Sequence, residues 1–301
     1  MNKVLLFIVC MISISLFDAC SKEIIDFETN LVERDNTYYK KYQDKPFSGN
    51  VFSKYENNTN RLEGTIKNGK KDDLWIEWYE NGGIKSEENY VKGSPDGEWK
   101  LWYKNGKLKL QSRYTKGKAD GLRMEWYENG NKKEKGYFKN NNFHGEWKKW
   151  YENGNISGHG NYIDNKENGK HFLWYQNGQK KSEAEFLNGE IIGSRKEWYQ
   201  NGQKKEEGNP DGFWTQWYGN GNRKGEGRYK NQKPVGTHRL WHENGQKKSE
   251  INFVNGIPHG FRFQWYENGQ LKEKGNFTNG NQNGEWTYYN KDGTIDGIEK
   301  Y

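Results

Sequence analysis

Aromatic and polar positions recur along the chain with a fixed period, and that period predicts the fold. Near-copies of one polar stretch with embedded aromatic residues stand at 125–138, 173–186 and 264–277. We take the first residue of each Trp-Tyr or Trp-His pair as an anchor. The anchors are Trp78, Trp102, Trp126, Trp150, Trp174, Trp198, Trp217, Trp241 and Trp265, with degenerate copies at Lys54 and Tyr289. Nine of the ten spacings are 24 residues and the tenth, from 198 to 217, is 19, which is typical of a repeat protein.

A turn signal follows nearly every anchor. Asparagine and glycine stand three and four places after it, at Asn105-Gly106, Asn129-Gly130, Asn153-Gly154, Asn177-Gly178, Asn201-Gly202, Asn244-Gly245 and Asn268-Gly269. The last copy uses Asp292-Gly293. Because both residues tolerate positive φ, this pair predicts a two-residue type I′ hairpin turn. Each repeat is therefore expected to be a β-hairpin, joined to the next by a looser turn that twice contains Pro-Asp-Gly, at 95–97 and 210–212.

Tandem hairpins predict an all-β chain. We expect an elongated, single-layer antiparallel sheet of tandem 24-residue β-hairpins, about eleven copies over residues 37–301. With strands about 4.8 Å apart, such a sheet is on the order of 100 Å long. Each hairpin packs only on its neighbours, so no central core is needed. The 19-residue step removes the end of one strand and predicts a notch or bend within residues 198–217.

A two-residue turn also fixes which side chains face each other. In that register each anchor lies opposite the position seven residues later, so tryptophan and a cation share one face. The basic residues at that position are Arg61, Lys85, Lys109, Lys133, Lys181, Lys205, Lys224, Lys248 and Lys272. On the other face, the aromatic residue twelve places after the anchor, such as Phe138, is expected to cover the glycine opposite it, such as Gly121.

Composition changes this picture little. A mean hydropathy of -1.31 and 30% charged residues would favour disorder, but 14 Trp, 20 Tyr and 37 Gly placed with a strict period do not. The net charge of +7 and a pI near 9.0 suit an anionic partner such as lipid headgroups, an acidic glycan or an acidic protein. Since acidic and basic residues are interleaved, a solvated surface without a ligand is the alternative.

The first 19 residues are typical of a signal peptide. Lys3 precedes an apolar stretch over residues 4–17, which has signal-peptide length and is too short to span a bilayer. The stretch ends at Ala19-Cys20-Ser21, which resembles a bacterial lipoprotein signal, with Phe17 and Asp18 where that pattern has leucine and a small residue. The resemblance implies cleavage before Cys20, acylation of its thiol, and a flexible tether over residues 20–36. A plain secretory signal and an uncleaved segment are the alternatives.

Catalytic and metal-binding patterns do not stand out. The six histidines are scattered, and His144 and His259 share a repeat position but lie 115 residues apart. His238 and His242 are four residues apart with no cysteine or carboxylate at metal-ligand spacing. The glycine spacing belongs to turns and does not match a phosphate-binding loop. We therefore expect no enzyme, no metal and no cofactor.

The repeat unit resembles the MORN repeat, in the bacterial variant with the pattern W-Y-x-N-G-Q-x-K. The passages at 144–154 and 95–106 carry the resemblance clearly, and it extends over roughly residues 36–301. Related proteins include the YwqK-type antitoxin family, whose members are taken to neutralise a toxin. Other MORN proteins are linked to membranes, to phosphoinositide kinases and to dimerisation. The resemblance therefore implies a binding role.

Together these patterns predict a non-enzymatic, lipid-anchored repeat protein of the cell envelope that binds a protein, an anionic lipid or a glycan. Nucleic acid is not expected, because an exported protein rarely meets it. The candidate binding surface consists of the nine anchor tryptophans and the eight lysines placed opposite them. A cytoplasmic antitoxin or immunity protein is the alternative function, and an envelope glycan-binding module, in which aromatic faces stack on sugar rings, is a third.

Overall fold

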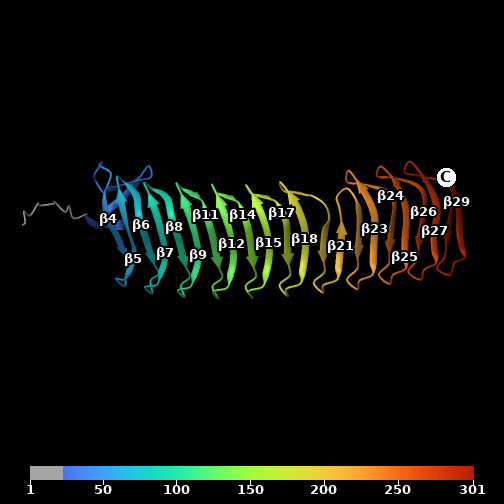
Figure 1. Ribbon diagram of the computed structural model, residues 1–301, viewed down its shortest axis with the longest axis horizontal. Helices are drawn as coiled ribbons and strands as arrows, with labels where there is room; N and C mark the ends of the chain where they lie inside the picture. Colours follow the sequence, from blue (N-terminus) through green and yellow to red (C-terminus); the bar gives the residue numbers. More distant parts are fainter. Residues whose placement is uncertain (1–22) are drawn as a thin grey trace, which may run out of the picture.

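The computed structural model describes residues 23–301, so the signal segment and Cys20 lie outside the described residues. The chain forms one long sheet of consecutive hairpins (Figure 1), which confirms the predicted all-β repeat fold. The first half of the chain contains β1 (Ile24–Asp26), α1 (Phe27–Asn30), β2 (Leu31–Arg34), β3 (Thr37–Lys40), β4 (Gly49–Lys54), β5 (Asn60–Lys67), β6 (Lys70–Trp78), β7 (Ile84–Val91), β8 (Ser94–Trp102), β9 (Leu108–Thr115), β10 (Lys118–Ala119), β11 (Gly121–Trp126), β12 (Lys132–Lys139), β13 (Asn142–Phe143), β14 (Gly145–Trp150) and β15 (Ile156–Ile163).

The second half continues the same pattern to the last hairpin. It contains β16 (Lys166–Glu167), β17 (Gly169–Trp174), β18 (Lys180–Leu187), β19 (Glu190–Ile191), β20 (Arg195–Trp198), β21 (Lys204–Gly208), β22 (Phe213–Trp217), β23 (Arg223–Lys230), β24 (Lys233–Trp241), β25 (Lys247–Val254), β26 (Ile257–Trp265), β27 (Leu271–Thr278), β28 (Asn281–Tyr289) and β29 (Ile295–Lys300). From β4 onward, neighbouring strands pair antiparallel in sequence order.

The hairpin turn differs from the predicted type I′ turn. Only its glycine takes a positive φ, for example 94° at Gly130, and Asn129 does not. The Gly130 N–H donates to the Tyr127 carbonyl at 2.8 Å, and the Tyr127 N–H donates to the Asn131 carbonyl at 2.8 Å. These bonds define a three-residue loop, in which a type I turn is followed by a left-handed glycine and a bulge. The Asn129 side chain stabilises this loop by accepting a bond from the Asn131 N–H at 2.8 Å.

The bulge moves the pairing at the anchor by one residue. Trp126 pairs with Lys132, six places later, whereas the sequence had placed it opposite Lys133. The preceding pairs keep the predicted register, as Glu125 opposite Glu134 shows. Since successive side chains of a strand point to opposite faces, Lys132 shares the face of Trp126 and Lys133 points to the other face. The predicted pairing of anchors with the lysines seven places later is therefore wrong.

Glycine is used at two strand positions, five places before the anchor in most repeats and ten places after it in several, and only the first was predicted. Gly121 pairs with Phe138 as expected, but an added Cβ there would first meet Arg113 and not the ring. Its φ of 117° is the reason for glycine, because L side chains rarely adopt that conformation. The ring-covered glycine is instead Gly136, where an added Cβ would clash with the indole of Trp147 in the next repeat.

Two side-chain bonds connect each hairpin to the next. The tyrosine after the anchor donates its hydroxyl to the backbone carbonyl of the following anchor, as Tyr127 does to Trp150 at 2.9 Å. The turn asparagine donates to the carbonyl two residues beyond that anchor, as Asn129 does to Glu152 at 2.9 Å. Both bonds recur along the array, with His242 once in place of tyrosine. A sheet without a central core is thus stabilised by contacts between neighbours.

An aromatic stripe runs along one face of the sheet. It consists of the residue three places before each anchor and the residue twelve places after it, and their rings lie against one another both within a repeat and between neighbouring repeats. Trp99 and Tyr114, for example, have ring centroids 4.9 Å apart, and Phe277 and Trp286 5.1 Å apart. In some repeats the position three places before the anchor holds arginine, and its guanidinium group packs over the neighbouring ring. The Arg123 guanidinium carbon, for example, lies 5.7 Å from the Phe138 ring centroid.

Residues 24–40 fold against the first hairpins, whereas the sequence had predicted a flexible tether over residues 20–36. β1 pairs parallel to β4, and β2 and β3 form a small separate sheet. Leu31 is buried with Val51 and Trp75, and the Phe27 ring lies 5.6 Å from that of Trp75. The tether prediction is wrong for this segment because its apolar side chains cover the exposed end of the first hairpin. The regular repeats begin at β4, later than the predicted residue 37.

The 19-residue step shortens the sheet locally. β21 and β22 have five residues each, whereas the second strand of a full repeat, such as β12, has eight. Figure 1 shows the short strand β21 in the middle of the array. The predicted notch is confirmed. The bond from the Tyr199 hydroxyl to the Trp217 carbonyl, 2.9 Å long, still connects the hairpins across it.

Candidate functional site

The anchor tryptophans form a half-buried row near the hairpin turns. Their cationic partners come from the preceding repeat, at the position six places after its anchor. Lys180 lies 5.2 Å from the Trp198 ring centroid, and Lys247 lies 5.4 Å from that of Trp265. Lys204 and Arg223 take the same place at Trp217 and Trp241. Tryptophan–cation pairs therefore exist, but with other residues than the sequence had placed there.

The lysines seven places after each anchor lie on the opposite face, where all of them are exposed. We call them the lysine row: Lys85, Lys109, Lys133, Lys181, Lys205, Lys224, Lys248 and Lys272. Several lie over the tyrosine that follows the anchor in the same hairpin, as Lys109 does 5.5 Å from the Tyr103 centroid and Lys272 does 5.9 Å from that of Tyr266. The structure thus separates the two halves of the predicted binding surface onto two faces.

Glutamates at the position before the anchor neutralise part of the lysine row. Glu77 pairs with Lys85 at 2.8 Å, and Glu197 pairs with Lys205 at 3.1 Å. Burial alone would raise the pKa of Glu197, but the hydrogen bond from Lys205 and the charge of Arg195 outweigh it and hold that pKa below its usual value. The hydrogen bond to Glu197 correspondingly raises the pKa of Lys205.

The neutralising glutamates stop at the short repeat. Each lysine of the row directly precedes the residue that pairs with the position before its own anchor and before the next, as Leu110 pairs with Leu101 and with Glu125. Up to Lys205, at least one of these two positions holds glutamate, namely Glu77, Glu125 or Glu197. Beyond it these positions hold Gln216, Leu240, Gln264 and Tyr288. Among residues 23–301, Lys85, Lys133 and Lys205 form ion pairs with these glutamates, whereas Lys224, Lys248 and Lys272, like Lys109 and Lys181, form none.

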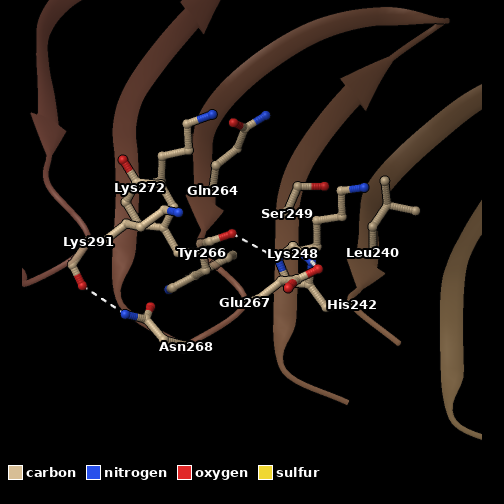
Figure 2. Close-up of a pocket in the computed structure, with 11 residues that line it drawn as sticks. Leu240, His242, Lys248, Ser249, Gln264, Tyr266, Glu267, Asn268, Lys272 and Lys291 are labelled. Carbon is tan, nitrogen blue, oxygen red and sulfur yellow. Dashed lines mark hydrogen bonds and ion pairs between the residues drawn. The ribbon is translucent and has the colours of Figure 1, made fainter. Parts of the chain in front are cut away.

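A groove of about 460 Å³ lies at the turn end of β25–β27 and is shown in Figure 2. Lys248, Lys272 and Lys291 line it, and Gln264 stands between the first two, because it pairs with Ser249 on one side and Glu273 on the other. Glu273 itself is bonded to Arg262 at 3.0 Å. The groove is therefore lined by three ammonium groups without carboxylate partners.

The ring groups of this groove are fixed by the bonds between hairpins. The Tyr266 hydroxyl donates to the Tyr289 carbonyl at 2.8 Å. The His242 Nε2 lies 2.9 Å from the Trp265 carbonyl, so it carries the proton and donates it. Glu267 lies at the rim with its side chain 81% exposed, 3.8 Å from His242 Nδ1. The lysine side chains are thus the groups of the groove that are free to contact a ligand.

The histidines around Trp241 have structural contacts in the described part of the chain. Between residues 23 and 301, no group of three or more His, Cys, Asp or Glu side chains is placed to hold a metal ion. His238 covers Gly227 and lies 2.9 Å from the Arg228 carbonyl, so both histidines around Trp241 contact backbone of neighbouring strands. In the same residue range no helix is long and apolar enough to cross a membrane.

The comparison with protein families decides the identity of the repeat. The model of the MORN repeat variant matches nine segments, at residues 74–92, 95–116, 119–140, 143–164, 167–188, 192–209, 210–231, 234–255 and 258–279. The chain belongs to the MORN repeat variant family. These MORN segments follow the hairpins of the sheet, and one of them, at 192–209, is the shortened repeat.

Other comparisons add little to the family. No curated protein matches the chain. Among solved structures, the chain is similar to the crystal structure of TcdB2-TccC3, with 9% identity over 90% of this chain and 20% of that chain. The TM-score of 0.16 is too low for that likeness to carry an argument.

Sequence analysis missed two features of this surface. The bulge after the type I turn decides which lysine shares a face with tryptophan, and an Asn-Gly pair is compatible with both turn types. The position before the anchor was not singled out, although an alignment of the repeats would have shown glutamate there at 77, 125 and 197. The absence of glutamate at this position from 216 onward is the signal that could have located the groove.

Proposed function

We propose that this MORN repeat array is a membrane-anchored binding module whose lysine row contacts an anionic partner at the cell envelope. The repeat fold itself supports a binding module. The observation that supports the finer proposal is the lysine row, which places an exposed cation at the same position of most hairpins along one face. Evenly spaced cations attract an extended anionic surface through many weak contacts that act together.

The anchoring part of the proposal rests on Cys20 and on the folded start of the array. β1 begins at Ile24, only four residues after Cys20. A fully extended chain covers about 3.5 Å per residue, so an acyl group on Cys20 would hold the first hairpins within about 15 Å of the bilayer surface. The predicted long tether is thereby replaced by a short one, which keeps the array close to the membrane.

Acyl labelling combined with membrane fractionation tests the anchor. We expect the native protein to be labelled and membrane-bound, and the Cys20→Ala variant to be unlabelled and released. Unlabelled native protein in the cytosol would contradict the proposal. The antitoxin role of the YwqK-type family that the repeats resemble would then become the proposed function.

Matched charge variants test the binding face. One variant replaces four residues of the lysine row, Lys205, Lys224, Lys248 and Lys272, with glutamine, and the control replaces four cations of the tryptophan face, Lys180, Lys204, Arg223 and Lys247, in the same way. We expect the first to lose binding to purified envelope fractions and the control to retain it. Equal loss in both variants would show that net charge, and not the lysine row, determines binding.

Glycan binding is a second candidate because one strand carries an unusual aromatic row. Phe261, Phe263 and Trp265 lie on the same side of β26, with neighbouring ring centroids 6.2 and 5.8 Å apart and ring planes within 29° of parallel. Phe261 is 70% exposed. If this row binds sugar rings, a variant with Phe261→Ala and Phe263→Ala should lose binding to purified wall polymer, while the lysine-row variant retains it.

A further inference from the structure

We propose that the groove at the turn end of β25–β27 is a phosphate-binding site, formed by Lys248, Lys272 and Lys291. This inference rests on the proposed function, because it assigns one place and one ligand chemistry to the lysine-bearing face. The ligand group is a phosphate ester, carried either by a lipid headgroup or by a soluble molecule.

The first argument is the loss of internal neutralisation. At the equivalent place in β11, the Glu125 carboxylate lies 3.4 Å from the Lys133 ammonium group and also pairs with Arg123. In the groove this position holds Gln264, which has the same size and no charge. Lys248 and Lys272 on either side are therefore left without a counter-ion from the described chain. Like charges held close together repel, so an external anion stabilises this arrangement.

The second argument concerns which side chains of the groove can still donate a hydrogen bond to a ligand. The rings of Tyr266 and His242 are committed to backbone carbonyls of the next repeat. The backbone of Lys291 is fixed because its carbonyl accepts a bond from the Asn268 amide at 2.7 Å, drawn as a dashed line in Figure 2. Its side chain therefore starts at the edge of the groove. With Ser249 and Gln264, the site offers three ammonium groups, a hydroxyl and a carboxamide.

The third argument is the match of charge and shape. Three lysines and the rim carboxylate of Glu267 leave the groove with a net charge of +2, excluding His242. A phosphate monoester carries about -1.5 to -2 charges at neutral pH and three acceptor oxygens in a tetrahedral arrangement. Lysine acts as a point charge that suits such a compact anion, whereas a planar carboxylate favours the fork of arginine. A groove of about 460 Å³ accommodates the phosphate and the group that bears it.

A single substitution with a matched control tests the site in the full chain. Gln264→Glu restores the carboxylate that other repeats have at this position, so the fold should tolerate it. We measure binding of glycerol 3-phosphate by titration calorimetry, and co-flotation with phosphatidylcholine vesicles with and without phosphatidic acid, whose headgroup is a phosphate monoester. We expect Gln264→Glu to weaken binding about tenfold or more, the scale of one charge-assisted contact. Gln264→Leu, neutral as Leu240 is in the preceding repeat, should weaken it less.

Two further variants keep the test independent of folding effects. Lys272→Gln removes an exposed cation of the groove and should also weaken binding. Glu125→Gln copies the groove's neutral residue into the first half of the array but should not create a second site beside Lys109 and Lys133, because Glu152 stands there at the position that Lys291 holds in the groove. Unfolding temperatures close to that of the native chain exclude loss of fold as the cause.

The outcomes separate the ligand sources and can overturn the proposal. Binding to glycerol 3-phosphate supports a soluble phosphate ester, and binding confined to vesicles that contain phosphatidic acid supports a lipid headgroup. If Gln264→Glu binds both probes as the native chain does, or if the native chain binds neither, the site is refuted. Sulfate that competes as well as phosphate would refute the phosphate assignment. The lysine-row test against envelope fractions is a separate measurement, so the proposed function can survive failure of this site.

Discussion

The short strands β21 and β22 divide the array into two regions that can be compared repeat by repeat. Both regions have the same contacts between hairpins, since Tyr127 before the division and Tyr266 after it donate the same bond to the next anchor. They differ at the position before the anchor, which is glutamate at 77, 125 and 197 and never acidic from 216 onward. Three lysines of the row, Lys85, Lys133 and Lys205, accordingly form ion pairs with these glutamates in the first region, and within residues 23–301 those of the second region form none.

This difference separates positions that build the sheet from positions that define its surface. A residue that bonds to the next hairpin is fixed in every repeat, because each hairpin depends on its neighbours. The residue before the anchor makes no such bond through its side chain, so it can vary without loss of the fold. Function is therefore to be sought where the two regions differ, and stability where they agree. Five sets of substitutions test this division.

The largest effect is expected at the tryptophans three places before an anchor. Trp147 and Trp286 are 8% and 1% exposed and cover a glycine of the preceding repeat, one in each region. Replacing either with alanine should lower the free energy of unfolding by about 3–5 kcal/mol, the usual loss for a buried aromatic side chain. Chemical denaturation of each variant measures it. A loss of stability in only one region would contradict the comparison. The control is Trp126→Ala at a half-buried anchor, which should lower the free energy of unfolding less.

The second effect concerns the glycines beneath those rings. An added Cβ at Gly136 or Gly275 would clash with the indole of Trp147 or Trp286. Valine at either position should destabilise the fold by about 1–3 kcal/mol, because the ring has to move away from the sheet. Thermal unfolding of both variants checks the expectation. Unchanged stability would mean that the indole does not lie against the glycine in solution.

A smaller effect is expected where the hairpins are bonded by tyrosine. Tyr127→Phe and Tyr266→Phe each remove one hydroxyl bond and should cost about 1 kcal/mol. His242→Tyr should be nearly neutral, since tyrosine makes the same bond in the other repeats. The denaturant midpoints of the three variants measure these changes in stability. If His242→Tyr were as costly as the phenylalanine variants, the histidine would have a role beyond this bond.

The sequence predicted the repeat, its length and the strand pairing, because a period of 24 residues and an Asn-Gly turn constrain the backbone strongly. It also located the notch, since a missing stretch of chain has to shorten a strand. The turn type could not be fixed in this way. Asn-Gly fits both a two-residue turn and a three-residue loop, and the choice depends on bonds such as that from the Asn131 N–H to the Asn129 side chain.

That one-residue difference explains why the candidate site was predicted only in part. The row of lysines was identified, but its face was not, because the bulge reverses the side on which Lys133 points relative to Trp126. The folded segment around Leu31 was missed for another reason. Its apolar residues follow no repeat, and their burial depends on the exposed end of the first hairpin, which only the assembled sheet defines.

The smallest effect is a pH dependence present in the first region. The pKa of Glu197 is held below its usual value in the folded chain, so this carboxylate stabilises the fold above the unfolded pKa of about 4.3. That contribution is lost as the pH falls through the lower, folded pKa. Glu197→Gln should therefore reduce stability at neutral pH and flatten the loss of stability in acid. Thermal unfolding of native and variant chains between about pH 3 and pH 7 measures both changes.

In the second region the corresponding substitution adds a carboxylate instead of removing one. Gln264→Glu places a carboxylate between Lys248 and Lys272, where burial and pairing resemble those of Glu197. It should gain a small stabilisation at neutral pH that disappears in acid, while Gln264→Leu should not. If Gln264→Glu shows no acid dependence beyond that of the native chain, the lysines of the groove do not approach this position. The contrast in charge between the two regions would then fail as an explanation of where an anion binds.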